Sequence, residues 1–383
     1  MNIILNYLTV RNLTILYCIV FVAVGLQKYA LGHYNNYMMF TLPSDWLLKG
    51  IPLYEWRVFQ PGEPPELFKY SPAFAFLMLP FAPLSVGLGV ALWNLLNATV
   101  LVYGILSFLK NDPEHRRRNV LLIVFLEGLI AAQNMQSNNL ILGFMLLGLT
   151  RLRDEKVFWA AFFFSIVAYF KVYGAAAAIF FLFYPRKLSF LASMAFWMVV
   201  LALLPLLVTS PAQLLSEYQQ WLTVASSSKV GSQVSVMGIL KSWFGLDVNF
   251  TLVEAVGLLL FLLPFLQFNK WQSLDFQRLM IAYFLVFVII FNPMAESPTY
   301  VYAITGVALW FTWQAPPTRL DWVLLALVIV FCSLSPSDLF PPSLRHGFFE
   351  PYSIKAFPCF LVWCWLQGLV WKKPQREVPV ALR

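Results

Sequence analysis

Twelve apolar runs, separated mostly by short polar connections, dominate this sequence of 383 residues. A helix needs about 20 apolar residues to cross a bilayer. Only 11% of the residues are charged, against about 25% in an average soluble domain, so a soluble globular fold is excluded. The sequence predicts an all-α polytopic membrane protein with about twelve transmembrane helices (11–13). The runs are 12–31, 86–109, 119–133, 138–151, 157–172, 174–185, 188–208, 250–268, 278–292, 299–313, 320–335 and 356–371.

The basic residues give the chain an orientation. With the N-terminus inside, 17 of the 26 Lys and Arg residues fall in inside loops or at inside ends, the pattern of the positive-inside rule. The net charge of +8 is therefore interpreted as topology and not as a nucleic-acid surface. We expect a multi-pass protein of the plasma (inner) membrane with both termini cytoplasmic and no nucleic-acid partner.

Three extracytoplasmic segments are too long to be simple connectors. They are a first loop at 32–85, a second at 209–249 and a third at 336–355, within a single membrane domain that spans residues 1–383. The apolar stretch 71–84 inside the first loop contains Pro72, Pro80 and Pro83. Counting it as a span would invert every later loop, so we expect a short helix that dips into the outer leaflet and returns.

Polar residues from distant parts of the sequence fall at the expected outer surface. Gln136 and Asn138 lie in the segment 133–139, Lys171 ends an apolar run, and Glu296 lies in a short outside turn. A polar hairpin and a lysine that reaches toward the headgroups are the simpler alternatives. A polar layer at the membrane surface favours an enzyme whose substrate has a lipid tail in the membrane and a polar head just above it. Membrane lipid is therefore an expected partner. A multi-pass lipid or solute transporter is the alternative function, and a non-catalytic scaffold is a third.

No cofactor or metal ion is expected from the sequence. It contains no glycine-rich phosphate loop and no Asp-x-Asp pair, and its four cysteines lack metal-ligand spacing.

Several short motifs occur in an order that resembles a known enzyme family. They are Gly50-Ile51-Pro52-Leu53-Tyr54, then Tyr70-Ser71-Pro72, then Ala91-Leu92-Trp93-Asn94, then Met135-Gln136-Ser137-Asn138, and finally Lys171. This order is similar to that of the integral-membrane glycosyltransferases of GT-C type. More narrowly, it resembles glycosyltransferase family 87, a group that includes polyprenyl-phosphate-mannose-dependent mannosyltransferases. The resemblance covers about residues 10–310.

The resemblance implies a reaction. A hexose, mannose-like by analogy, would pass with inversion from a polyprenyl-phosphate sugar donor to a hydroxyl of a glycan or glycolipid acceptor at the extracytoplasmic face. The leaving phosphate needs nearby cations more than a strong general acid. Within this reading, Tyr70 belongs to the substrate site, and four cations are candidates for the phosphate: Lys69, Lys171, Arg345 and His346.

Two positions depart from the family pattern. The resemblance implies a catalytic aspartate 14 residues before Gly50, where this chain has Asn36, followed by Tyr37. An asparagine cannot accept a proton at neutral pH, so Asn36 and Tyr37 are expected to orient hydroxyl groups instead. The glycine of the family's Gly-Gln-x-Asn element is replaced by Met135.

Either this branch has altered chemistry, or another carboxylate acts as the general base; for that role the first loop offers Glu66, Asp45 and Glu55. If the stretch after Glu66 is helical, Glu66 and Lys69 share a face and place a base beside a phosphate-binding cation. An ordinary surface ion pair is the alternative. Asp45 follows Pro43-Ser44, a pattern typical of a helix start.

Overall fold

Helices form nearly all the regular structure of this protein. The computed structural model describes residues 8–227, 234–314 and 316–372. Within these ranges, β-type pairing is limited to one isolated bridge between Arg57 and Glu66. The prediction of an all-α membrane protein is confirmed.

The chain divides into two compact units, Met1–Lys229 and Val230–Arg383. The first unit holds the first loop and most of the residues selected from the sequence. Its helices are α2 (Val10–Ala30), α3 (Asn35–Lys49), α4 (Pro72–Leu77), η1 (Leu79–Phe81), α5 (Val86–Phe108), α6 (Glu114–Gln133), α7 (Asn138–Arg153), α8 (Val157–Phe170), η2 (Val172–Phe183), α9 (Lys187–Leu203), η3 (Leu204–Leu207) and α10 (Pro211–Ser227).

The second unit is built around α13, which packs against α14 and α17. The Tyr283 hydroxyl of α13 is hydrogen-bonded to Gln367 of α17, so a polar contact joins two apolar helices. The helical segments of this unit are α11 (Val236–Phe244), α12 (Phe250–Leu262), η4 (Leu263–Leu266), η5 (Phe268–Lys270), α13 (Leu274–Ile290), η6 (Ser297–Thr299), α14 (Tyr300–Trp313), α15 (Arg319–Val328), η7 (Ile329–Leu334), α16 (Pro342–Leu344), η8 (Arg345–Phe349) and α17 (Ala356–Trp371).

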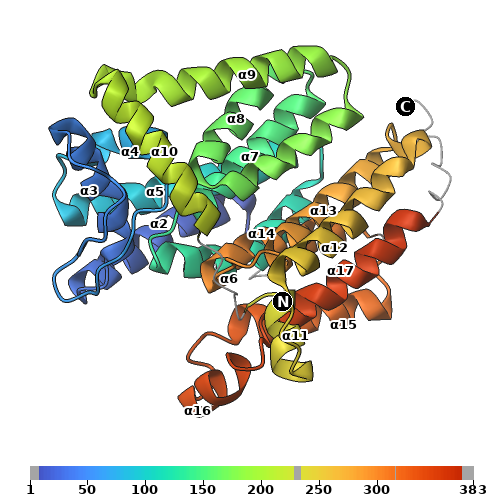
Figure 1. The fold of residues 1–383 in the computed structure, drawn as a ribbon. Helices are drawn as coiled ribbons and strands as arrows, with labels where there is room; N and C mark the ends of the chain where they lie inside the picture. Colours follow the sequence, from blue (N-terminus) through green and yellow to red (C-terminus); the bar gives the residue numbers. More distant parts are fainter. Residues whose placement is uncertain (1–7, 228–233, 315, 373–383) are drawn as a thin grey trace. The chain divides into compact units, whose positions relative to one another are not determined.

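In the first unit, α5 packs against α2 and α7, α7 packs against α8, and α8 packs against α9 (Figure 1). The contact between α5 and α7 is close because glycines face it. A Cβ atom on Gly104 would lie 2.6 Å from the Gly143 carbonyl oxygen. Small residues of this kind allow membrane helices to approach backbone to backbone, where lipid supplies no hydrophobic drive for association.

The apolar runs of the sequence are helical, and further helices such as α3, α10 and α11 lie in the segments predicted as long loops. Three helices are long and apolar enough to cross a membrane by length and composition: Val10–Ala30, Val86–Phe108 and Lys187–Leu207. Other apolar helices are shorter; Val157–Phe170, for example, has 14 residues and a length of about 21 Å. The count of twelve spans therefore stays a prediction.

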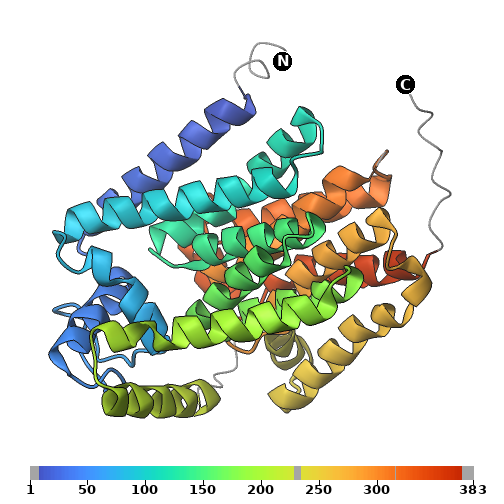
Figure 2. The same ribbon diagram turned by 90° about the horizontal axis from the view of Figure 1, so that it is seen from above.

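The loop helices α3 and α4 and the amphipathic helix α10 gather at one end of the first unit in both ribbon views (Figures 1 and 2). The helix α4 has six residues and is followed by the 3₁₀ turn η1. This element is too short to cross a hydrocarbon core of about 30 Å. The proposed dip into the outer leaflet remains a prediction.

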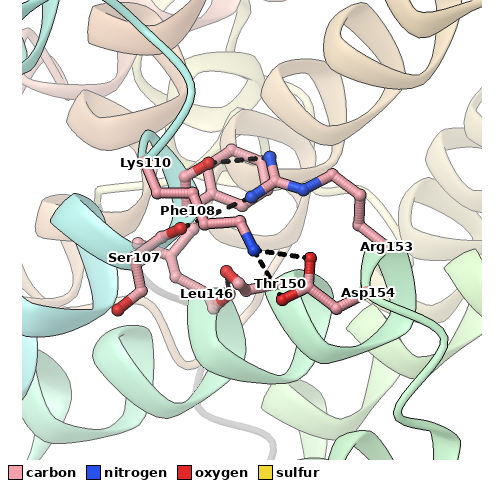
Figure 3. Close-up of polar contacts among 7 residues, drawn as sticks. All are labelled: Ser107, Phe108, Lys110, Leu146, Thr150, Arg153 and Asp154. Atoms are coloured by element: carbon pink, nitrogen blue, oxygen red, sulfur yellow. Dashed lines mark hydrogen bonds and ion pairs between the residues drawn. The ribbon is translucent and has the colours of Figure 1, made fainter.

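The C-terminal end of α7 is held against the C-terminal end of α5 by charged side chains (Figure 3). Arg153 donates to the carbonyl oxygens of Phe108, at 2.8 Å, and Ser107, at 3.4 Å. Lys110 forms an ion pair with Asp154 at 2.7 Å. A cationic side chain is favourable here because the last carbonyl groups of a helix have no partner within it.

Candidate functional site

The corner between α6 and α7 is the first part of the candidate site. Met135 has a φ of +52°, in the left-handed region that favours glycine. The corner is held by α5: Trp93 Nε1 donates to the Met135 carbonyl at 2.9 Å, and Asn97 Oδ1 accepts from the Leu140 amide at 3.0 Å. The positive φ explains why a glycine suits this position, and the Trp93 bond to the main-chain carbonyl helps to hold the corner in this conformation.

Asn138 and Lys171, 33 residues apart, meet at this corner. The Lys171 ammonium donates to Asn138 Oδ1 at 2.9 Å. They meet because α7 begins at Asn138, α8 ends before Lys171, and the two helices pack together. Asn138 is completely buried, whereas Lys171 is half-buried.

Several polar atoms around this pair are buried without a hydrogen-bond partner among the described residues. They are Gln136 Oε1, Ser137 Oγ, Asn138 Nδ2 and Asn139 Oδ1. A buried polar atom left in this state costs about 1–3 kcal/mol. These atoms supply both donors and acceptors at the corner.

The loop helix α3 is attached to the same corner. Asn36 Nδ2 donates to the Asn134 carbonyl oxygen at 2.9 Å. The Tyr37 hydroxyl is buried and lies against α5, where a Cβ on Gly89 would stand only 1.7 Å from it. Burial raises the pKa of Tyr37 to about 12, so this phenol stays protonated at neutral pH.

Glu66 is oriented by α3, not by Lys69. Asn35 Nδ2 donates to Glu66 Oε1 at 2.8 Å. The main chain of Glu66 pairs with Arg57 in the isolated bridge, with N···O distances of 2.9 and 3.0 Å. A carboxylate is favourable beside the first turn of a helix such as α3.

The prediction that Glu66 and Lys69 share a helical face is wrong. Residues 67–70 are not helical, and no ion pair joins the two side chains in the part of the chain that the structure describes. Pro64 and Pro65 precede this stretch and Pro72 follows it. Pro72 biases the residue before it toward extended backbone, which disfavours a helix that continues through this stretch.

The other two loop carboxylates have local partners. Asp45 pairs with Lys49 at 2.6 Å, and Glu55 pairs with Arg57. The expectation that Asp45 starts a helix is wrong, because α3 begins at Asn35 and continues through Pro43. Its buried apolar side chains, which include Phe40 and Leu47, offset a proline penalty of about 3 kcal/mol.

The Tyr-Ser-Pro element is folded onto α3 and α8. The ring of Tyr70 stacks on Phe74 with centroids 4.6 Å apart and meets Phe40 edge-on at 5.1 Å. Ser71 caps α4 by accepting from the Phe74 amide, and it donates to the Tyr169 carbonyl at 2.7 Å. The structure thus places Tyr70 between the loop and the membrane helices, while Lys69 is exposed.

Glu217 of α10 was not selected from the sequence. It is buried and accepts a hydrogen bond from the Leu53 amide at 3.2 Å, which ties α10 to the Gly-x-Pro-x-Tyr segment. Burial raises the pKa of Glu217. The signal that could have revealed it is a carboxylate on the apolar face of an amphipathic helix, in register with Leu214 and Val224.

The remaining three residues selected from the sequence lie in the second unit. Glu296 begins η6, where its amide donates to Thr299 Oγ1 at 3.2 Å. Arg345 pairs with Asp338 at 3.0 Å, and His346 contacts Glu350 at 3.0 Å. All three partner side chains, Thr299, Asp338 and Glu350, come from nearby in the sequence, so local structure accounts for these contacts.

Comparison of the sequence with models of known protein families identifies the class of enzyme. Residues 68–336 match the model of glycosyltransferase family 87, which is more than half of the chain. The chain belongs to glycosyltransferase family 87. A search of the curated proteins gives no match.

The family 87 match confirms the resemblance given above and makes this chain a membrane glycosyltransferase, which needs a sugar donor and an acceptor. The matched range contains Lys69, Tyr70, the Asn138–Lys171 pair and Glu296. It begins after α3 and Glu66 and ends before Arg345. The match thus covers the α6–α7 corner, whereas the candidate bases lie before the matched range.

Proposed function

We propose that this glycosyltransferase moves a hexose from a polyprenyl-phosphate carrier to a hydroxyl of a glycan or glycolipid at the extracytoplasmic face of the plasma (inner) membrane. It would be a multi-pass GT-C enzyme with both termini cytoplasmic. The observation that carries the proposal is the Lys171–Asn138 pair at a corner rich in partnerless polar atoms, in a chain of family 87.

Lys171 binds the carrier phosphate in this proposal. The bond to Asn138 Oδ1 positions the ammonium group, whose positive charge attracts phosphate oxygens. Asn138 Nδ2 is a second donor at the same place. As the sugar leaves, negative charge grows on the phosphate, and fixed donors stabilise that charge without having to reorganise.

Glu66 is the proposed general base. The acceptor hydroxyl gives its proton to Glu66 while its oxygen attacks the anomeric carbon, and the bond from that carbon to the carrier phosphate breaks with inversion. Asn35 orients one carboxylate oxygen of Glu66. The neighbouring Asn36 bonds to the α6–α7 corner and so joins the loop that carries the base to the phosphate site.

The test is transfer from a radiolabelled polyprenyl-phosphate hexose by the purified chain. Label should move from the carrier to the acceptor, and Lys171→Gln should slow transfer about tenfold to a hundredfold, the value of a charge-assisted hydrogen bond. Lys49→Gln, at a lysine whose ion-pair partner among residues 8–227, 234–314 and 316–372 is Asp45 alone, is the matched control and should leave transfer unchanged. Movement of intact carrier across vesicles without bond cleavage would support a transporter instead.

A further inference from the structure

A second site, distinct from the one above, lies at the other ends of α7 and α8. It is an open cavity of about 610 Å³ between the turn that joins α7 to α8 and the turn that precedes α9. Three cations and one carboxylate line it, together with apolar side chains. The lining residues are Arg151, Glu155, Lys156, Val157, Phe158, Trp159, Phe163 and Arg186.

The charge of this cavity is unbalanced. Glu155 contacts Arg186 only at 3.8 Å, and both side chains are more than half exposed. Within the described residues, neither Arg151 nor Lys156 has an ion-pair partner. The neighbouring Asp154 does not compensate, because it is paired with Lys110 (Figure 3).

Two helix N-termini add to the positive potential. Lys156 is the N-cap residue of α8 and Arg186 that of α9, and neither helix has a side-chain capping bond. The first amides of a helix lack partners within it and carry the positive end of its dipole. Cations and helix N-termini together form a setting for a phosphate group.

The aromatic lining indicates whether the phosphate group belongs to a lipid or to a soluble molecule. Phe158 and Trp159 are 41% and 51% exposed beside the charged turns, and both pack against Trp197 of α9. Aromatic side chains next to basic residues at the end of apolar helices are typical of the headgroup level of a bilayer. A soluble phosphate would leave this aromatic surface without a partner, whereas a lipid would cover it with its acyl chains.

We propose that the cavity binds the headgroup of an anionic phospholipid, with the phosphodiester between Arg151, Lys156 and Arg186 and the glycerol backbone and acyl chains against Phe158 and Trp159. The site is separate from the sugar-transfer site, since α7 and α8 run their full length between the two. The proposal does not depend on the identity of the sugar donor.

Native mass spectrometry of the full chain in detergent tests this proposal. Phosphatidylglycerol and phosphatidylcholine with the same acyl chains are titrated separately. We expect one phosphatidylglycerol to bind more tightly than phosphatidylcholine. Arg151→Gln/Arg186→Gln should weaken that binding roughly 30-fold, since each basic residue near an anionic lipid contributes about fivefold.

The control is Arg117→Gln/Arg319→Gln, which removes two basic residues that do not line the cavity. It should bind phosphatidylglycerol as the unaltered chain does. Equal binding of the two lipids by the unaltered chain, or equal loss in both double variants, would overturn the proposal. So would displacement of the lipid by inorganic phosphate, which would assign the cavity to a soluble anion. The comparison of the two lipids needs no variant, so it decides the matter even if a variant fails to fold.

Discussion

Among the single residues of the first unit, Glu66 gives the sharpest test of the proposed general base. Glu66→Gln keeps the size of the side chain and an oxygen for Asn35, but it cannot take a proton. If Glu66 is the base, transfer should fall about a hundredfold or more. The measurement is turnover with a labelled carrier, together with the affinity for that carrier, which should stay unchanged.

Glu63→Gln is the matched control for this experiment, because Glu63 lies in the same loop among prolines and makes no ion pair in the described residues. It should retain full turnover. If Glu66→Gln also turned over normally, Glu66 would be removed from the role, and Glu55 and then Asp45 would be examined.

The buried carboxyl group of Glu217 predicts that the stability of the folded chain depends on pH. Because burial raises its pKa in the folded state, the folded chain holds this proton more tightly than the unfolded chain does. Stability from this group is therefore complete below the ordinary glutamate pKa of about 4.3 and declines as the pH rises through the higher, folded value. Glu217→Gln should remove that decline while keeping an acceptor for the Leu53 amide.

The measurement is the thermal unfolding midpoint from pH 4 upward for both proteins. The midpoint of the unaltered chain should fall more steeply with rising pH than that of Glu217→Gln. Parallel curves would show that the burial of Glu217 has no thermodynamic effect. Glu254→Gln, at a glutamate of α12 in the second unit, serves as the control and should follow the unaltered chain.

At the level of helices, the packing of α3 against α5 depends on one glycine. A Cβ at Gly89 would stand 1.7 Å from the Tyr37 hydroxyl and 2.6 Å from its Cζ, so Gly89→Ala must push α3 away. We expect a loss of about 1–3 kcal/mol in the free energy of unfolding, the usual cost of overpacking. Transfer should also fall, because α3 carries Asn35 and Asn36.

Gly368→Ala in α17 is the control, since nothing lies within 4 Å of its added Cβ. Its stability should be unchanged or slightly higher, as alanine is the better helix former. Chemical denaturation of both variants measures the difference. Equal stability of the two variants would contradict the packing of Tyr37 against α5.

For the whole molecule, the main open prediction is topology. The distribution of basic residues predicts that Arg116–Arg118 lie in the cytoplasm and Glu63 on the opposite side. Reporter fusions at these two positions should give opposite signals. Two signals from the same side would overturn the topology and also the placement of the sugar-transfer site at the outer surface.

The sequence alone determined the fold class and the positions of the apolar helices. Hydropathy is a local property, and in lipid every backbone amide must be paired within its own helix, so an apolar run that crosses has to be helical. The run 86–109, for example, became α5 at Val86–Phe108. The ordered motifs also predicted family 87, which the family match confirmed.

Tertiary structure alone decided which polar side chains meet. Hydropathy predicted that Asn138 and Lys171 share one surface, but their bond arises from the packing of α7 against α8. Glu66 was assigned to Lys69 by sequence spacing, yet it bonds to Asn35, which is 31 residues away. The physical reason is that spacing fixes partners only inside a regular helix, whereas a loop interrupted by prolines leaves that choice to the elements that pack around it.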